Sequence, residues 1–362
     1  MYVKLIQYHF WKMELKTCKF ESISKVNFDT IIDVRSPKEF TEDHIPNSIN
    51  LPVLSDFERE VVGKIYIQNS QFEAKKIGAK YISENISKHL EGLLSNKNDN
   101  WKALIYCWRG GQRSKSLGIV LHEIGWDINI LEGGYKCYRK NVVKNLYEDE
   151  LFHNIFIISG YTGTGKTLML QELSNIGAQV IDLEKLANHK GSIFGSQPNG
   201  QPSQKRIEGD IHNLLKSFKP QIPIFIESES SKIGYLKIPP ALWKKMKSSP
   251  HFELSSNIVS RAKFLSTQYP ELYKDTKKLL EKIKLLKEFH KNETIIGWKN
   301  LIEKKDFFTL SKELIEIHYD PKYKNSNNYN EKSKIQKIDL DPNIKNSVNE
   351  VANLILAKSN KI

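Results

Sequence analysis

The chain has 362 residues, and 55 Lys or Arg against 42 Asp or Glu give it a formal net charge of +13 at pH 7. A mean hydropathy of −0.48 and the lack of a long apolar run argue against a membrane span. The first residues also lack the apolar core and cleavage site of a secretory signal, so we expect a cytoplasmic protein. The length predicts two domains and a further segment. The positive charge favours an anionic partner, nucleic acid above all, unless the lysines serve only solubility.

The first segment, residues 15–145, alternates short apolar runs with helical patterns. Residues 30–34, 103–106 and 127–131 read as strands, and residues 114–124 as a helix that ends before a glycine. This alternation predicts an α/β domain with a parallel sheet.

The sequence Cys-Trp-Arg-Gly-Gly-Gln-Arg-Ser at residues 107–114 joins one of these strands to the helix. Two glycines let several backbone N–H groups converge on one point, and the helix start adds positive potential. Arg109 and Arg113 add full charges. We therefore expect Cys107 to have a lowered pKa and to act as a nucleophile or as a carrier of sulfur or selenium. The alternative is an inert cysteine that ends a core strand.

The other two cysteines, Cys18 and Cys137, lack such surroundings, although Cys137 follows Gly133-Gly134 and a resolving role stays open. Three cysteines are too few for a disulfide framework and fit a reducing compartment. No Cys-x-x-Cys pair or His/Cys cluster occurs, so we expect no structural metal.

A second α/β domain is predicted at residues 150–255. The sequence Gly-Tyr-Thr-Gly-Thr-Gly-Lys-Thr at residues 160–167 matches the phosphate-loop (P-loop) pattern, between an apolar strand and a helix. The glycines Gly160, Gly163 and Gly165 let backbone N–H groups surround phosphate oxygens. Lys166 neutralises charge, and the Thr167 hydroxyl can hold Mg²⁺.

Three carboxylates are candidate site residues of this domain. Asp182 and Glu227 end predicted strands, and Glu229 follows two residues later. The carboxyl ends of parallel strands face the ligand, which favours Glu227 as the Walker B acid with Glu229 second. Asp182 could equally cap the next helix.

The C-terminal segment, residues 256–362, is rich in lysine and shows no strand pattern, so we expect it to be mainly helical. Residues 277–291 carry apolar positions at helical spacing, and residues 321–341 read as a polar loop. Trp243 and Trp298 could stack on RNA bases or belong to the core.

The cysteine loop, with Asp-Val-Arg-Ser-Pro-Lys-Glu-Phe at residues 33–40 and His-Ile-Pro-Asn-Ser-Ile-Asn-Leu-Pro at residues 44–52, resembles the rhodanese family. In that family the loop cysteine carries transferable sulfur. The resemblance implies that Asp33, Arg35 and Glu39 mainly shape the domain.

A rhodanese-like domain followed by a P-loop domain is similar to the bacterial tRNA 2-selenouridine synthase family over about residues 28–245. Residues 182–195, 201–204 and 226–234 extend the similarity. The chain departs from the family's Glu-Asp-Glu-Ser, because it has Glu227-Ser228-Glu229-Ser230.

This resemblance implies that selenium from selenophosphate replaces the sulfur of wobble 2-thiouridine in tRNA. The S-geranyl intermediate would form from geranyl diphosphate. The partners would be the tRNA anticodon loop and the enzyme that supplies selenophosphate, with no membrane involved. Whether the P-loop takes ATP, geranyl diphosphate or both stays open.

Two other functions stay open. One is an ATP-dependent sulfurtransferase or kinase fusion, which ATP turnover without RNA would favour. The other is a non-catalytic RNA-binding redox sensor, which full function of a Cys107→Ala variant would favour.

Overall fold

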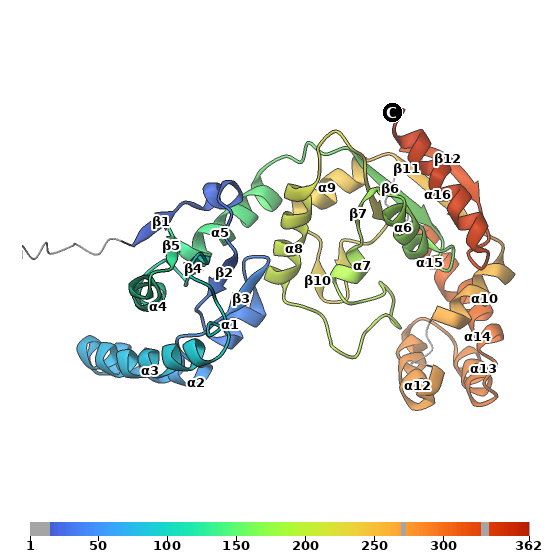
Figure 1. Ribbon diagram of the computed structural model, residues 1–362. Helices are drawn as coiled ribbons and strands as arrows, with labels where there is room; N and C mark the ends of the chain where they lie inside the picture. The colour runs from blue at the N-terminus through green and yellow to red at the C-terminus, as the bar shows by residue number, and fades with distance from the viewer. Residues whose placement is uncertain (1–14, 269–272, 327–332, 362) are drawn as a thin grey trace, which may run out of the picture. The chain divides into compact units, whose positions relative to one another are not determined.

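The computed structural model describes residues 15–268, 273–326 and 333–361. The chain divides into two compact units that meet between Val143 and Lys144. Figure 1 shows their elements in chain order. Within the described ranges, no helix is both long enough and apolar enough to cross a membrane.

The N-terminal unit is built on a five-stranded parallel sheet in the order β1-β5-β4-β2-β3. Its strands are β1 (Lys16–Cys18), β2 (Thr30–Asp33), β3 (Ser48–Asn50), β4 (Lys102–Tyr106) and β5 (Asp127–Leu131). Its helices are η1 (Phe20–Lys25), α1 (Pro37–Glu42), α2 (Asp56–Gln68), α3 (Gln71–Glu91), α4 (Gln112–Ile124) and α5 (Gly134–Val143). The predicted parallel α/β architecture is confirmed.

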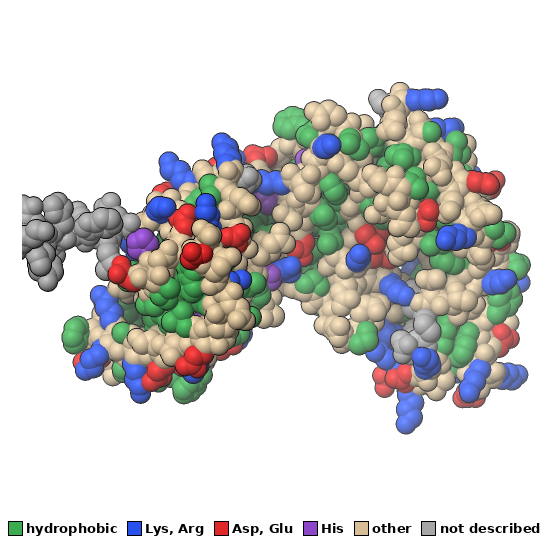
Figure 2. Space-filling model, viewed as in Figure 1, with side chains coloured by type: hydrophobic (Ala, Val, Ile, Leu, Met, Phe, Trp, Pro, Cys, Tyr) green, Lys and Arg blue, Asp and Glu red, His purple; other side chains and the backbone are tan. Residues whose placement is uncertain are grey.

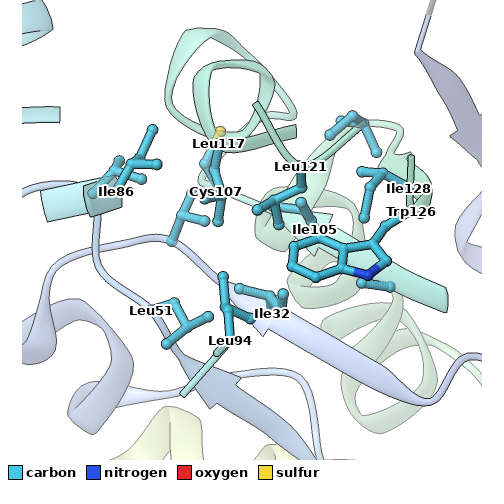
Figure 3. Close-up of a cluster of buried hydrophobic side chains, with 14 of the residues drawn as sticks. Ile32, Leu51, Ile86, Leu94, Ile105, Cys107, Leu117, Leu121, Trp126 and Ile128 are labelled. Carbon is cyan, nitrogen blue, oxygen red and sulfur yellow. The ribbon is translucent and has the colours of Figure 1, made fainter. Parts of the chain in front are cut away.

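The central strand of this sheet, β4, is buried almost throughout, because apolar side chains cover both of its faces. Ala103, Leu104 and Ile105 have no exposed surface, which is typical of a parallel sheet between helices. Figure 3 shows Ile105 and Cys107 among the buried side chains of this core. Because β4 is buried in this core, the carboxyl end of the strand has a fixed position. Cys107 follows directly and is positioned with it.

The C-terminal unit has a second five-stranded parallel sheet, in the order β12-β11-β6-β8-β7. Its strands are β6 (Ile155–Gly160), β7 (Gln179–Ile181), β8 (Ile224–Glu227), β11 (His251–Ser255) and β12 (Lys334–Asp339), with a separate hairpin of β9 (Lys232–Ile233) and β10 (Leu236–Lys237). Its helices up to residue 268 are η2 (Lys144–Glu148), α6 (Lys166–Asn175), α7 (Leu183–Leu186), α8 (Gln204–Ser217), α9 (Pro240–Ser248) and α10 (Ile258–Gln268). The remaining helices are α12 (Thr276–Lys284), η3 (Leu285–Glu288), α13 (Asn292–Glu303), α14 (Phe307–Glu313), η4 (Leu314–Tyr319), α15 (Asp320–Ser326) and α16 (Lys345–Ser359).

The C-terminal segment is mainly helical, as predicted, but the expectation that it holds no strand is wrong. β12 pairs in parallel with β11 and forms the edge of the P-loop sheet, and α15 also lies within the expected loop. The strand escaped prediction because it lies at the edge of the sheet, where it pairs only with β11, and because its residues Lys-Ile-Gln-Lys-Ile-Asp do not alternate strictly. Ile338 and Leu340 bury their side chains in the core of this sheet.

The helices between α10 and β12 form a small core together with Phe194 from the loop between α7 and α8. Leu279, Ile283 and Leu286 bury one face of the predicted amphipathic helix, which changes to a 3₁₀ turn at Leu285. Trp298 is fully buried in the same core. This tryptophan is therefore a core residue and is not available to stack on RNA.

Candidate active sites

Cys107 lies directly after β4, where the chain turns toward the start of α4. Its sulfur accepts a hydrogen bond from the backbone N–H of Gly111 at 3.2 Å and lies 3.3 Å from the Ser114 hydroxyl. Only 3% of the residue is exposed. The sulfur is thus more deeply buried than the sequence suggested, but polar hydrogens do converge on it.

The surroundings of the Cys107 thiol lower its pKa. Burial is the largest single influence and opposes ionisation. Hydrogen bonds from the Ser114 hydroxyl and from the backbone N–H groups of Arg109 and Ser114, with the charge of Arg113, outweigh it. The loop therefore favours the thiolate, the form of cysteine that attacks electrophiles.

Gly134, at the start of α5, packs directly against the backbone of the cysteine loop. It has φ +56°, and a Cβ placed on it would lie 2.3 Å from the Cys107 carbonyl oxygen and 2.6 Å from the Gly110 nitrogen. The neighbouring N–H of Tyr135 donates to the Cys107 carbonyl at 2.9 Å. Only glycine permits this close approach, since any side chain would push the loop away.

The two predicted loop arginines occupy different environments. Arg113 makes an ion pair with Glu39 at 2.7 Å, and both side chains are mostly buried. Arg109 is exposed. Arg113 therefore acts as a fixed positive charge near the thiol, whereas Arg109 is positioned to reach an anion.

The remaining cysteines do not share these features. Burial raises the pKa of both Cys18 and Cys137, and nearby glutamates add to the effect. Asp33 and Arg35 form a buried ion pair at 2.6 Å, and the Arg35 guanidinium lies 3.9 Å from the centre of the Tyr135 ring. This pair has the structural position that the sequence predicted for it.

The second site is the P-loop between β6 and α6. Gly160, Gly163 and Gly165 all have positive φ, at 141°, 84° and 85°, which lets the backbone curl around an anion. The Lys166 ammonium donates to the Gly160 carbonyl at 2.9 Å. Gly160 also needs to lack a side chain because a Cβ there would lie 2.5 Å from the Leu254 carbonyl oxygen of β11.

Beside the loop lie the carboxylates that follow β7 and β8. The Thr167 hydroxyl donates to Glu184 at 3.1 Å, and the Glu184 backbone N–H donates to Glu227 at 2.9 Å. Glu184 and Glu229 converge, because a Cβ on Gly191 would lie within 2.6 Å and 2.9 Å of their oxygens. The structure thus brings Thr167, Glu227 and Glu229 together around Glu184.

The pKa values of these acids are raised. Burial is the main cause for Glu227, which is 1% exposed, and the neighbouring carboxylates add to it. Burial and the proximity of Glu184 raise the pKa of Glu229 to about 8. The second carboxyl oxygen of Glu227 is buried with no hydrogen-bond partner. Such a group is a candidate to meet a cation or a protonated ligand.

Asp182 serves the local fold. Its side chain accepts from the Lys185 backbone N–H at 2.8 Å and so caps α7, which is the alternative that the sequence left open. Burial nevertheless raises its pKa.

A pocket of about 440 Å³ opens beside the P-loop, within the C-terminal unit. Its charged side holds Lys166, Lys190, Glu184 and Glu229. The C-terminal helices contribute the apolar and aromatic side chains Phe264, Leu265, Tyr319 and Tyr323 to the lining, together with Lys322. A pocket of this size suits a small phosphorylated molecule.

Several of these residues were not among the sequence-predicted site residues. Glu184 lies two residues after a predicted strand-end acid, and that spacing could have identified it. The pocket residues of α10, η4 and α15 carry no motif, so only the tertiary contacts reveal them.

Comparison with known families gives matches in both units. Residues 20–141 match the rhodanese-like domain, and residues 153–294 match the tRNA 2-selenouridine synthase AAA domain.

Individual relatives agree with these matches. A tRNA 2-selenouridine synthase of Psychromonas ingrahamii is 35% identical over 240 residues, which cover 66% of this chain and 64% of that protein. One from Shewanella denitrificans is 37% identical over 219 residues, covering 60% and 59%. The alignments span just under two thirds of the length of these curated relatives. A solved N-terminal domain of a Clostridium difficile 630 protein is 38% identical with a TM-score of 0.32, over 35% of this chain and 99% of that one.

Proposed function

Because the chain is homologous to tRNA 2-selenouridine synthases and carries a rhodanese-like domain before their AAA domain, we propose that it replaces the sulfur of wobble 2-thiouridine with selenium. The observation that supports this most is the presence of two separate anion-binding loops in one chain. One holds a thiol with a lowered pKa, and the other is a P-loop with an apolar wall beside it.

The proposed reaction has two steps. In the first, the sulfur of 2-thiouridine attacks C1 of geranyl diphosphate, a carbon–oxygen bond breaks, diphosphate leaves and the base loses its N3 proton. In the second, the selenium of selenophosphate adds to C2 of the base and the geranyl thiolate leaves; water then cleaves the selenium–phosphorus bond, which releases phosphate and returns a proton to N3. S-alkylation makes sense physically because a thiocarbonyl sulfur is a poor leaving group and an alkyl thiolate is a better one.

The P-loop would bind the diphosphate of the geranyl donor. Lys166 and the backbone N–H groups of the loop would stabilise the negative charge that develops on the leaving diphosphate. Thr167 and Glu184 offer oxygen ligands 3.1 Å apart, a donor type that Mg²⁺ prefers, and the neighbouring Glu227 carboxylate has one oxygen without a hydrogen-bond partner. Mg²⁺ bound there would neutralise diphosphate charge.

The Cys107 loop would bind the selenophosphate that supplies the selenium. Its converging N–H groups suit an anion, whether a bound selenophosphate or the thiolate itself. Exposed Arg109 would contact the phosphate group of the incoming donor, while Arg113, held by Glu39, would maintain the positive potential.

The tRNA would bind to the lysine-rich surface of the C-terminal helices. Lys277, Lys278, Lys284 and Lys287 are exposed on α12 and η3, and Figure 2 shows lysine and arginine side chains over this segment. Contacts between lysines and phosphates would make binding fall with rising salt concentration. Trp243, which is half-buried, stays a candidate for base stacking.

Single-step assays test the division of labour between the two loops. Lys166→Met should abolish S-geranylation of a 2-thiouridine RNA and leave selenation of a pre-geranylated RNA intact, whereas Cys107→Ser should do the reverse. Lys219→Met, at an exposed position, is the matched lysine control. Equal loss of both steps in each variant would contradict the assignment.

Mass spectrometry of wobble nucleosides tests the function itself. Cells grown with selenium should lose 2-selenouridine and its S-geranyl precursor when the gene is deleted. If both nucleosides persist, the proposed function is wrong. ATP turnover without RNA would instead favour the ATP-dependent fusion.

A further inference from the structure

One wall of the P-loop pocket comes from the C-terminal helices. Phe264 and Leu265 belong to α10, Tyr319 ends η4, and Tyr323 lies in α15. All four are partly buried and line the pocket. This wall is therefore built by a part of the chain that carries no recognisable motif.

Direct contacts hold the wall against the P-loop. A Cβ on Gly163 would lie 3.1 Å from Leu265, so the α10 side chain rests directly on the loop backbone. The Gly160 N–H donates to the Tyr323 hydroxyl at 3.2 Å, and the Tyr323 ring packs on Tyr161 with centroids 4.6 Å apart. The wall therefore borders the phosphate loop directly.

A buried ion pair keeps α10 and α15 in place. Arg261, which is 5% exposed, binds Asp320 through two hydrogen bonds of 2.9 Å and 2.6 Å. It also donates to the Thr162 carbonyl of the P-loop at 2.8 Å. One side chain thus joins the two helices of the wall to the phosphate loop, which fixes the distance between the charged and apolar parts of the pocket.

We propose that Phe264, Leu265, Tyr319 and Tyr323 form the binding site for the hydrocarbon chain of an allylic diphosphate, and that they select the donor. This inference rests on the proposed function. The charged side of the pocket recognises only the diphosphate, which nucleoside diphosphates and triphosphates also carry. Selectivity must then come from the group beyond the phosphates, and each methylene buried against an apolar wall adds to affinity.

Competition binding on the full chain, without RNA, tests the wall. Wild-type protein should bind inorganic pyrophosphate weakest, dimethylallyl diphosphate more tightly and geranyl diphosphate more tightly again. Phe264→Ala should weaken geranyl diphosphate about ten-fold and leave pyrophosphate unchanged, since loss of one buried aromatic contact removes roughly 1.4 kcal/mol or more. Val259→Ala, at a 55% exposed position on the same helix, is the control and should change neither affinity.

The outcomes separate this inference from the proposed function. If wild-type protein prefers geranyl diphosphate to pyrophosphate but Phe264→Ala keeps that preference, the hydrocarbon chain of the ligand binds elsewhere and the inference is wrong. If wild-type protein shows no gain along the chain-length series, or if ATP binding rather than prenyl binding depends on Phe264, the inference is wrong as well. Should Phe264→Ala fail to fold, the wild-type series and Phe264→Leu, with a smaller expected loss, still decide it. The proposed function fails separately, if no S-geranyl nucleoside forms.

Discussion

Replacement of Gly134 by alanine would test how the cysteine loop is held. An alanine at φ +56° costs roughly 1–2 kcal/mol in backbone strain alone. Its Cβ would also lie 2.3 Å from the Cys107 carbonyl oxygen, so the two loops must separate. Separation breaks two backbone hydrogen bonds, Tyr135–Cys107 and Lys136–Trp108, and each loss lowers the free energy of unfolding by about 1 kcal/mol. The total predicted destabilisation is about 3–4 kcal/mol.

Gly125→Ala provides the matched control within the same unit. Gly125 also has positive φ, at 111°, but a Cβ there meets no atom within 4 Å. The free energy of unfolding of Gly125→Ala should therefore fall only by the cost of backbone strain. Urea unfolding followed by tryptophan fluorescence measures both free energies.

The pH dependence of Cys107 alkylation, followed by peptide mass spectrometry, adds a second measurement. Gly134→Ala should raise the pKa of Cys107, because the N–H groups that stabilise the thiolate move with the loop, and Gly125→Ala should not. Equal unfolding free energies and unchanged pH profiles in the two variants would refute the reasoning.

Three further predictions concern single contacts. Ser114→Ala should raise the pKa of Cys107 and shift its alkylation profile to higher pH, and an unchanged profile would show that the hydroxyl does not stabilise the thiolate. Asp320→Ala should destabilise the C-terminal unit by about 3 kcal/mol, because it leaves the buried Arg261 charge uncompensated; Arg261→Met in the same chain should recover much of the loss in urea unfolding. Burial lowers the pKa of His212 to about 4, below the roughly 6.5 of an unfolded histidine. Between these two pH values the unfolded state therefore binds more protons than the folded state. Stability should fall as pH drops from about 6.5 to 4, and His212→Leu should flatten that part of the curve.

The position of both glycine-rich loops could be predicted because each loop is continuous in sequence. A strand, a glycine-rich turn and a helix start determine the direction of nearby N–H groups within eight residues. The parallel sheets followed in the same way from apolar runs such as those at β4 and β6. Glu227 was predicted as a candidate site residue because parallel strands end on one side of a sheet, and Glu229 because it follows two residues later.

Other features depend on contacts between distant residues. The burial of Cys107, the pairing of Arg113 with Glu39 and the joining of β12 to β11 carry no local signal. The same holds for the helices that place Phe264 and Tyr323 beside the P-loop.

The amino-acid sequence by itself therefore determined where the two glycine-rich loops lie between a strand and a helix, since local backbone geometry suffices for that. Only the tertiary structure decided which carboxylates meet at Thr167 and what kind of wall faces the phosphate loop. The physical reason is that burial, pKa and ligand shape arise from side chains that lie far apart along the chain and meet only after folding.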